Sequence, residues 1–548
     1  MTIPVSSSAL RSAADIRRFP WIRRLAADYA YNFTALAPFF AGNPADPAAW
    51  PAAIARAQAH PRERDHVVAA IAAQQEQRGA PAAARMAARR LGDPAAVAIV
   101  TGQQAGLFGG PLFTLLKALT AIKLAARVSR DHGVPVVPVF WVESEDHDWD
   151  EVSSCPVLDA ELRRETITLG TPPTAGQEPV ASVRLDPSIF AAIEGLKAVL
   201  PGTDFTDALI EGLSKAYRPG ASMSQAFGQW LESVLGHFGL VVYDSSEPAT
   251  KALARRIFVQ ELQSPTETTR RARESGDALV ALGYHAQVVS HEDNVALFRL
   301  DGVRQTIHFR DGHFVVGATD VPVGTLVAQA ERQPEMFSPN VLLRPVVQDT
   351  LFPTICYVAG PNELAYLGQL KPVYERFSVP APLMFPRASI TLLDSAAAKF
   401  LARYDVALES LQPDDESTLN RLLESQLPRS VEAAFESTTR TVDSSMGALA
   451  AAVPSVDPTL EGATRSALGR MQHDLQALHG KIVQAAKRRD DTLRRQFART
   501  RAQAFPGGHP QERSVGFVYF LNRYGPALVD RLHEELPLDL GKHWIMTI

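Results

Sequence analysis

A short apolar segment that leads through a glycine-rich loop into a helical pattern is the feature that most constrains this fold. Residues 95–101 (AAVAIVT) predict a strand, and residues 102–111 (GQQAGLFGGP) predict a loop. In residues 112–128 (LFTLLKALTAIKLAARV) the apolar side chains recur at helical spacing. Because strand, glycine loop and helix begin a Rossmann-type unit, we expect an α/β protein with a parallel sheet covered by helices.

The same alternation continues along the chain. Residues 134–142 (VPVVPVFWV) are apolar on both faces, which is typical of a covered parallel strand, and residues 240–243 follow an amphipathic helix. Residues 351–359 form another apolar strand, which turns through Gly360 and Pro361 into a helix that we expect Asn362 to cap. Ligands of such sheets bind beyond the carboxyl ends of the strands, so the residues after each strand are candidates for a site.

Two regions depart from this alternation. Between residues 284 and 317, two alternating segments flank the pair Asp301-Gly302, and Asp311-Gly312 repeats this turn signal, which predicts an antiparallel insertion. After residue 392 the pattern becomes helical, and an apolar seam predicts a coiled-coil hairpin that turns near Pro454 and Pro458. The seam and its expected antiparallel partner comprise Leu468, Met471, Leu475, Leu478 and Ile482, and Leu419, Leu422, Leu427, Val431 and Phe435.

These patterns predict three parts of the chain. Residues 1–392 form a Rossmann-like core with inserted segments, and residues 393–502 form a helical coiled-coil domain. Residues 503–548 form a C-terminal segment that returns to the core. An apolar seam on a protruding hairpin needs a partner, so we expect a homodimer through the coiled coil.

Charge and cysteine content exclude several classes of function. The chain has 55 Lys and Arg against 60 Asp and Glu, a net charge of −5 that repels nucleic acid. It has no run of about 18 apolar residues that would span a membrane. Cys155 and Cys356 form no C-x-x-C pair, which favours a reducing compartment over a structural zinc cluster. We therefore expect a cytoplasmic protein without nucleic-acid or membrane partners.

The glycine-rich loop is the first candidate for ligand binding. It lacks both the G-K-[ST] ending of a Walker loop and the G-x-G-x-x-G spacing. Its glycines would let the backbone approach a ligand, and the free N–H groups at the start of the next helix would attract an anion. The alternative is a tight turn without a ligand. The candidate residues are Gln103, Gln104, Gly106, Gly109, Gly110 and Lys117.

Acidic side chains crowd the end of the strand over residues 134–142. They are Glu143, Glu145, Asp146, Asp148, Asp150 and Glu151, with His147 among them. Such carboxylates could hold Mg²⁺ on a nucleotide or accept a proton from an amine, although a solvated acidic loop is the alternative. We take Asp146, His147 and Asp148 as catalytic candidates and Glu145 as a binding candidate. His147 and Cys155 alone are too few ligands to predict zinc.

Three further places contain polar residues in apolar surroundings. Arg344 and Gln348 lie in the stretch FSPNVLLRPVVQD, where a guanidinium needs an internal carboxylate or a carboxylate substrate. Arg387 and Ser389 lie at alternating positions in PRASIT. This pattern suits either phosphate binding or a loop whose polar groups bond to other groups of the protein. The third place, Asn362 and Glu363, follows the strand over residues 351–359.

Because parallel strand ends converge, we expect one cavity lined by Gln103, Gln104, His147, Asp148, Arg344 and Asn362.

Several segments carry a family resemblance. They read TGQQAGLFGGPLFTLLKA, PVFWVESEDHDWDEV, YRPGASMSQAF, FSPNVLLRPVVQDTLFPTICYVAGPNELAY, PRASITLL, HPQER and NRYG. In them the chain resembles the cysteine-adding enzymes of bacillithiol biosynthesis. The resemblance implies a Rossmann core with connecting-peptide insertions, a dimeric coiled-coil domain, and a ligase that joins cysteine to glucosaminyl malate. Since amide formation from a free carboxylate is uphill in water, it further implies activation by ATP, with Mg²⁺ as a possible companion.

The resemblance also suggests roles for the expected cavity. Gln103 and Gln104 would hold phosphate or carboxylate together with the glycine backbone, and Arg344 would meet a malate carboxylate. Asn362 would orient cysteine or ribose, while His147 and Asp148 would deprotonate the glucosamine ammonium. Related ligases carry an H-x-G-H signature, whereas the corresponding loop here has Gln103 and Gln104 and no histidine. Two alternatives to the ligase function are a nucleotidyltransferase that acts on another small molecule and a non-catalytic coiled-coil assembly protein.

Overall fold

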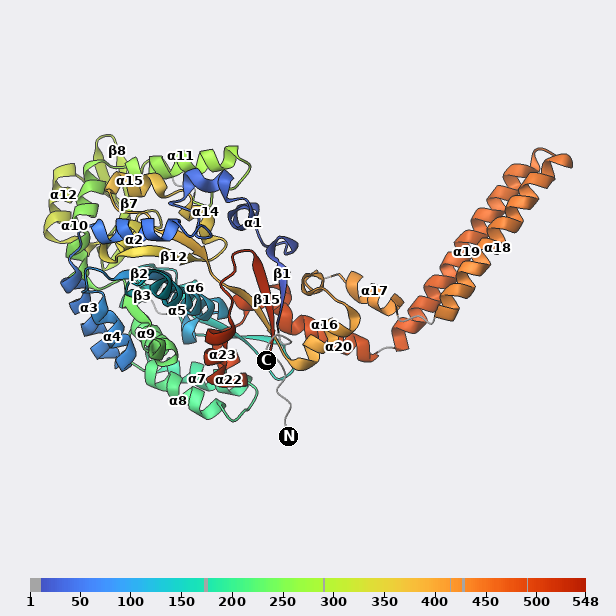
Figure 1. Cartoon of the computed structure of the whole chain (residues 1–548), viewed down its shortest axis with the longest axis horizontal. Helices are drawn as coiled ribbons and strands as arrows, with labels where there is room; N and C mark the ends of the chain where they lie inside the picture. Colours follow the sequence, from blue (N-terminus) through green and yellow to red (C-terminus); the bar gives the residue numbers. More distant parts are fainter. Residues whose placement is uncertain (1–10, 172–175, 289–290, 414, 426–428, 490) are drawn as a thin grey trace. The chain divides into compact units, whose positions relative to one another are not determined.

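The structure is a computed structural model that describes residues 11–171, 176–288, 291–413, 415–425, 429–489 and 491–548. The chain divides into two compact units (Figure 1). The first runs up to Thr391 and includes Pro510–Met546, and the second comprises Leu392–His509 and Thr547–Ile548.

A five-stranded sheet forms the centre of the first unit. Its strand order is β13-β12-β2-β3-β6, and all four neighbouring pairs are parallel. The bounds are β13 Leu383–Pro386, β12 Thr354–Ala359, β2 Val97–Gln104, β3 Val136–Glu143 and β6 Val241–Asp244. This confirms the Rossmann-like core. β2 extends beyond the predicted end at residue 101, because Gln103 and Gln104 pair with Val142 and Glu143 of β3.

Helices cover both faces of this sheet, because successive side chains of a strand point to opposite sides. Val97 and Ile99 of β2 pack in one core with α5 (Leu112–His132) and α2 (Ala49–Ala59). Ala98 and Val100 face the other core. That core includes side chains from α3 (Arg64–Arg78), α4 (Ala82–Arg90) and α10 (Pro248–Gln263). The sheet is therefore doubly wound, and its polar residues are confined to the strand ends.

The predicted antiparallel insertion forms a second five-stranded sheet of order β10-β9-β8-β7-β11. Its strands are β7 Asn294–Asp301, β8 Val303–Arg310, β9 His313–Val316, β10 Thr319–Val321 and β11 Phe337–Pro339. The Asp-Gly turns form as expected, with φ of 71° at Gly302 and 82° at Gly312. The sheet continues to residue 339, beyond the predicted end at 317, because β11 pairs with β7.

The C-terminal segment of the first unit packs on the helix that follows β2. It contains α21 (Gln511–Ser514), α22 (Phe517–Tyr524) and α23 (Ala527–Glu535), each of which contacts α5. It ends in β15 (Lys542–Thr547), which pairs with β1 (Arg11–Asp15). The two ends of the described chain therefore share one small sheet.

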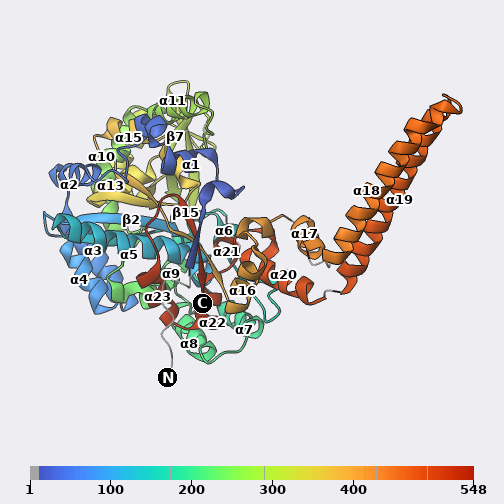
Figure 2. The same ribbon diagram turned by 45° about the vertical axis from the view of Figure 1, so that its right-hand side comes forward.

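The second unit contains the predicted coiled coil, a hairpin of α18 (Arg429–Ala452) and α19 (Leu460–Arg489) (Figures 1 and 2). The helices reverse direction around Val453–Ser455, near the predicted turn. None of the described helices is both long and apolar enough to cross a membrane.

The predicted seam differs in detail. Leu475 and Ile482 are half-buried, but Met471 and Leu478 are 45% and 52% exposed. Leu419 and Leu422 belong to a separate helix, α17 (Ser417–Ser425), and Leu427 lies outside the described residues. α18 therefore leaves part of the apolar face of α19 exposed.

Candidate active site at the carboxyl edge of the parallel sheet

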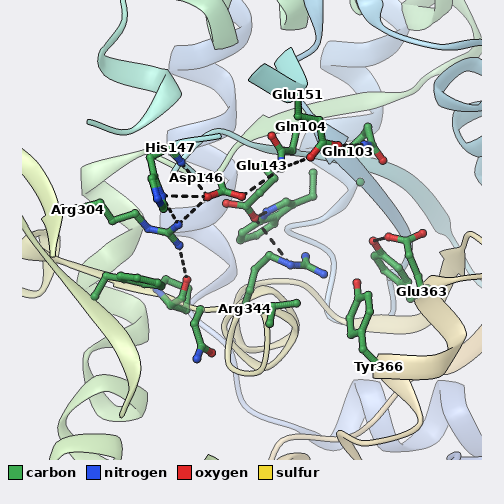
Figure 3. Close-up of a pocket in the computed structure, with 17 residues that line it drawn as sticks. Gln103, Gln104, Glu143, Asp146, His147, Glu151, Arg304, Arg344, Glu363 and Tyr366 are labelled. Carbon is green, nitrogen blue, oxygen red and sulfur yellow. Dashed lines mark hydrogen bonds and ion pairs between the residues drawn. The ribbon is translucent and has the colours of Figure 1, made fainter. Parts of the chain in front are cut away.

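A cavity of about 500 Å³ lies where β2, β3 and β12 end (Figure 3). These strands and the residues that follow them supply Gln103, Gln104, Trp141, Glu143, Asp146, His147, Glu151, Tyr357, Glu363 and Tyr366. The insertion and the start of α13 (Arg344–Leu351) supply Phe298, Arg304, Pro339, Asn340, Val341 and Arg344. Its volume is in the range of roughly 300–1,000 Å³ that small-molecule sites occupy.

One corner of the cavity is rich in hydrogen-bond acceptors. The side-chain amide of Gln104 donates to Glu151 at 2.8 Å and to Asp146 at 3.1 Å, and that of Gln103 lies 3.4 Å from Glu151. The buried Oε1 atom of Gln104 has no donor among the described residues. Burial, followed by the charges of Asp148 and Asp146, raises the pKa of Glu151. This corner therefore favours a cationic group, and Glu151 binds a proton more readily than an ordinary glutamate.

Arg304 of β8 lies against this corner, although the sequence pattern did not single it out. Its guanidinium donates to Asp146 at 2.8 Å and to the carbonyl of Pro339 at 3.2 Å, and it lies 3.2 Å from Nδ1 of His147. It stacks 3.9 Å from the Phe298 ring, and its buried Nε atom has no acceptor among the described residues. The one signal in the sequence was an arginine two residues after the Asp301-Gly302 turn of the insertion.

Arg344 is a second guanidinium in the cavity. It is the first residue of α13, donates to Gln348 at 3.1 Å, and lies 3.8 Å from a Glu143 oxygen. Burial alone would lower its pKa, but the charges of surrounding acidic groups, Tyr357 first, leave the pKa above its usual value. Gln348 is fully buried and supports Arg344 instead of lining the cavity. Figure 3 shows Arg344 across the cavity from Gln104 and Glu151.

The cavity brings together four of the six side chains that the sequence predicted to line it, namely Gln103, Gln104, His147 and Arg344. Asp148 is not among them. It caps α6 (Trp149–Val152) by accepting from the Glu151 N–H, and it lines an adjoining cavity of about 420 Å³ with Asp146 and His147.

Asn362 is also outside the described lining, and the prediction that it caps a helix was wrong. Its side chain makes no capping hydrogen bond to α14 (Glu363–Leu367). The Glu363 carboxylate instead accepts from the Gly360 N–H, so it occupies the turn that Asn362 was expected to close.

Lys117 and Glu145 are buried in ion pairs beside the cavity. Lys117 lies 2.7 Å from Glu363 and donates to the Gly102 carbonyl and to Oε1 of Gln103, which holds that amide in place. Burial lowers the pKa of Lys117 and raises that of Glu145, which pairs with Lys251. Both side chains support the site from outside its lining.

The glycine loop does not open onto the cavity. Gly106, Gly109 and Gly110 are buried; the Gly109 N–H donates to the Tyr217 hydroxyl, and the Gly110 N–H donates to Leu107. The C-terminal segment covers the start of α5, where a Cβ atom on Gly109 would lie 2.3 Å from Phe517. The loop is therefore a tight turn in which the N–H groups of Gly109 and Gly110 are bonded within the chain.

Arg387 and Ser389 belong to a closed network. Arg387 forms a two-pronged ion pair with Glu512 at 2.9 and 2.6 Å, and Ser389 donates to the same carboxylate at 3.1 Å. His543 contacts Ser389 at 2.7 Å, and burial lowers the pKa of His543 to about 4. These contacts fit the second interpretation, a loop whose polar groups bond to other groups of the protein.

Comparison with known proteins adds a family to this geometry. Residues 13–388 match the family described as bacillithiol biosynthesis BshC, N-terminal Rossmann-like domain, and residues 390–548 match the BshC C-terminal coiled-coil domain. The chain belongs to the BshC family. The first match contains the parallel sheet with its insertion. The second contains the helical hairpin and also the C-terminal segment that packs on α5.

Curated BshC relatives match along most of the chain. The protein of Salinibacter ruber is 33% identical over all of both chains, and that of Koribacter versatilis is 34% identical over 94% of this chain and 95% of its own. The protein of Symbiobacterium thermophilum is 34% identical over 87% and 89%. Each of the three is named "Putative cysteine ligase BshC".

Proposed function

We propose that this chain is a cysteine ligase of bacillithiol biosynthesis, which joins the carboxyl group of cysteine to the amine of glucosaminyl malate. One observation carries the proposal: a single cavity holds an acceptor-rich corner, with the Arg304 guanidinium beside that corner and the Arg344 guanidinium across from it. An enzyme that forms an amide must hold an amine and a carboxylate side by side, and these two regions suit those two charges.

The acceptor corner is the proposed amine site. The substrate ammonium would lie among Asp146, Glu151 and the unpartnered Oε1 of Gln104. Before the nitrogen can attack, the ammonium transfers one proton to a base and becomes a neutral amine. We assign that base to Glu151, whose pKa is raised, with His147 as the second candidate. Asp148 then acts indirectly, since it caps the helix that carries Glu151.

The guanidinium groups are the proposed carboxylate site. Arg344 would bind a malate carboxylate, because its distance of 3.8 Å from Glu143 leaves donors for a ligand. Arg304 would bind a second anionic group through its free Nε atom.

ATP is part of the proposal because a free carboxylate does not form an amide spontaneously. When bound, ATP would supply the phosphoryl or adenylyl group that turns the cysteine carboxylate into a reactive acyl donor. The lining fits a nucleotide in two respects: Arg304 and Arg344 offer donors for an anion, and Trp141 and Tyr357 offer aromatic surface. The described residues contain no group of three or more metal-ligating side chains, so the proposal brings Mg²⁺ in on the nucleotide.

The test is direct. The purified full chain is incubated with cysteine, glucosaminyl malate and ATP, and the thiol product and AMP or ADP are measured by mass spectrometry. Production of AMP would indicate an adenylate, and ADP an acyl phosphate. Transfer of a nucleotidyl group without an amide product would instead favour the nucleotidyltransferase alternative. Absence of both products would favour the assembly-protein alternative.

We also propose that the hairpin mediates a homodimer in the cytoplasm. Met471 and Leu478 are exposed one heptad apart on α19, and Leu449 of α18 is 49% exposed. A second copy would cover this apolar stripe. Light scattering should give the dimer mass for the wild type and the monomer mass for M471D/L478D. A monomer mass for the wild type contradicts the proposal.

A further inference from the structure

Three cationic side chains surround one aromatic ring next to the cavity. The ring is that of Phe113, the second residue of α5. The Arg387 guanidinium lies 5.5 Å from its centroid, that of Arg513 lies 5.6 Å from it, and Nζ of Lys117 lies 5.9 Å from it. Arg513 comes from α21, which contacts α5 (Figure 2). One ring alone does not offset three positive charges, so each cation needs a partner of its own.

Two of these cations have such partners. Lys117 lies 2.7 Å from Glu363, and Arg387 is held by both oxygens of Glu512. Arg513 differs, because its guanidinium makes no hydrogen bond or ion pair to any residue that the structure describes. Of these three cations, Arg513 is therefore the one whose guanidinium has no bonded partner among the described residues, although the nearby carboxylate of Glu512 acts on its charge.

The surroundings of Arg513 make this charge available to a ligand. The side chain is exposed to solvent, yet the protein around it excludes enough water to lower its pKa, and the positive charge of Arg387 lowers the pKa further. Its electrostatic neighbours include Glu151 and Glu363, which both line the cavity. Arg513 shares the Phe113 ring with Lys117, which lies 2.7 Å from Glu363 of the cavity lining, so it lies beside the proposed active site. Its guanidinium donors have no acceptor among the described residues.

We propose that Arg513, seated on the Phe113 ring, forms an anion subsite beside the cavity, and that it binds a phosphate or pyrophosphate group. The planar fork of a guanidinium matches the oxygens of such a group in a two-pronged geometry. Two ligands share this chemistry, the phosphate chain of a bound nucleotide and the free pyrophosphate or phosphate that activation would release. The nucleotide case rests on the proposed function, whereas binding of the inorganic anion does not.

Calorimetric titration of the full chain with inorganic pyrophosphate at constant ionic strength tests the subsite. We expect R513A to weaken pyrophosphate binding about tenfold or more, the effect of one charge-assisted contact, and R513K to retain part of the affinity. The matched control is R332A, because Arg332 is an exposed arginine at the end of α12 (Val323–Arg332). It should bind pyrophosphate as the wild type does.

Three results would overturn the subsite: equal pyrophosphate affinity for R513A and the wild type, an equal loss for R332A, or Arg513-dependent binding of malonate in place of pyrophosphate. Titration with ATP separates the two phosphate sources. If R513A binds both ATP and pyrophosphate about tenfold more weakly than the wild type, the subsite holds the phosphate chain of the nucleotide. If only pyrophosphate binding is weakened, the subsite holds the released anion.

The ligase assay keeps this inference distinct from the proposed function. Arg513-dependent pyrophosphate binding without any amide product supports the subsite and contradicts the ligase. Amide formation by R513A, with unchanged pyrophosphate affinity, supports the ligase and contradicts the subsite.

Discussion

The glycine loop and the strand-end cavity both follow β2, and their sequences predict ligand binding for the same reason, yet only the cavity keeps polar groups available. In the loop, the N–H groups of Gly109 and Gly110 bond internally, and the segment around Phe517 covers the start of α5. In the cavity, Oε1 of Gln104 and Nε of Arg304 have no hydrogen-bond partner in the part of the chain that the structure describes. A motif that could bind an anion does so only where no other part of the chain has already satisfied its donors.

The largest expected effect is on the amine corner of the cavity. Glu151→Gln removes the proposed base while keeping the side chain's shape, so the rate of thiol formation should fall by about 10²- to 10⁴-fold. The pKa of Glu151 is raised, so the wild-type rate should fall as pH drops through that pKa and Glu151 becomes protonated. E151Q should lose this acid limb.

The exposed Glu165 of β5 (Arg164–Thr168) supplies the control, E165Q, which should keep the wild-type rate and pH profile. If the rate of E151Q lies within about threefold of the wild-type rate, Glu151 is not the base, and His147 is left as the candidate for that role.

The next effect concerns the closed loop. Gly109→Ala places a Cβ atom 2.3 Å from Phe517 at a φ of +96°, so unfolding free energy should fall by about 2–4 kcal/mol. Gly133→Ala is the matched control, because φ is also positive there but nothing lies within 4 Å of the added atom. Denaturant titration should show a clearly smaller loss for G133A. Equal losses would mean that packing against Phe517 is unimportant.

A smaller effect should distinguish Arg344 from the acceptor corner across the cavity. Arg344→Lys keeps the charge but loses the two-pronged geometry, so KM for glucosaminyl malate should rise about tenfold, with kcat changing less. Steady-state kinetics with that substrate as the variable measure this. A change confined to kcat would place Arg344 in the chemical step instead of in binding.

The smallest expected effect is at Asn362. Its side chain neither caps α14 nor belongs to the described lining of the cavity, so Asn362→Ala should change stability by less than about 0.5 kcal/mol and leave KM unchanged. Thermal melting and kinetics check both. A marked rise in KM would show that the cavity extends to this residue when substrate binds.

The sequence by itself determined the parallel sheet, the antiparallel insertion and the helical hairpin. Each depends on local periodicity: apolar runs in β2 and β3, alternation around Gly302, and three- and four-residue spacing in α19. The convergence of Gln104 and His147 was also predictable, since both lie where parallel strands end at one edge. Arg344 reaches the same cavity from the start of α13, which follows the insertion.

Only the tertiary structure decided which polar residues face the cavity and which are paired. Arg304 enters from the insertion, across more than 150 residues of chain, to meet Asp146. Glu512 neutralises Arg387 from the C-terminal segment, whereas the neighbouring Arg513 forms no ion pair with any of the described residues. Periodicity reports which face of an element is buried, but the pairing of charges depends on contacts between segments far apart in the sequence, which no local pattern encodes.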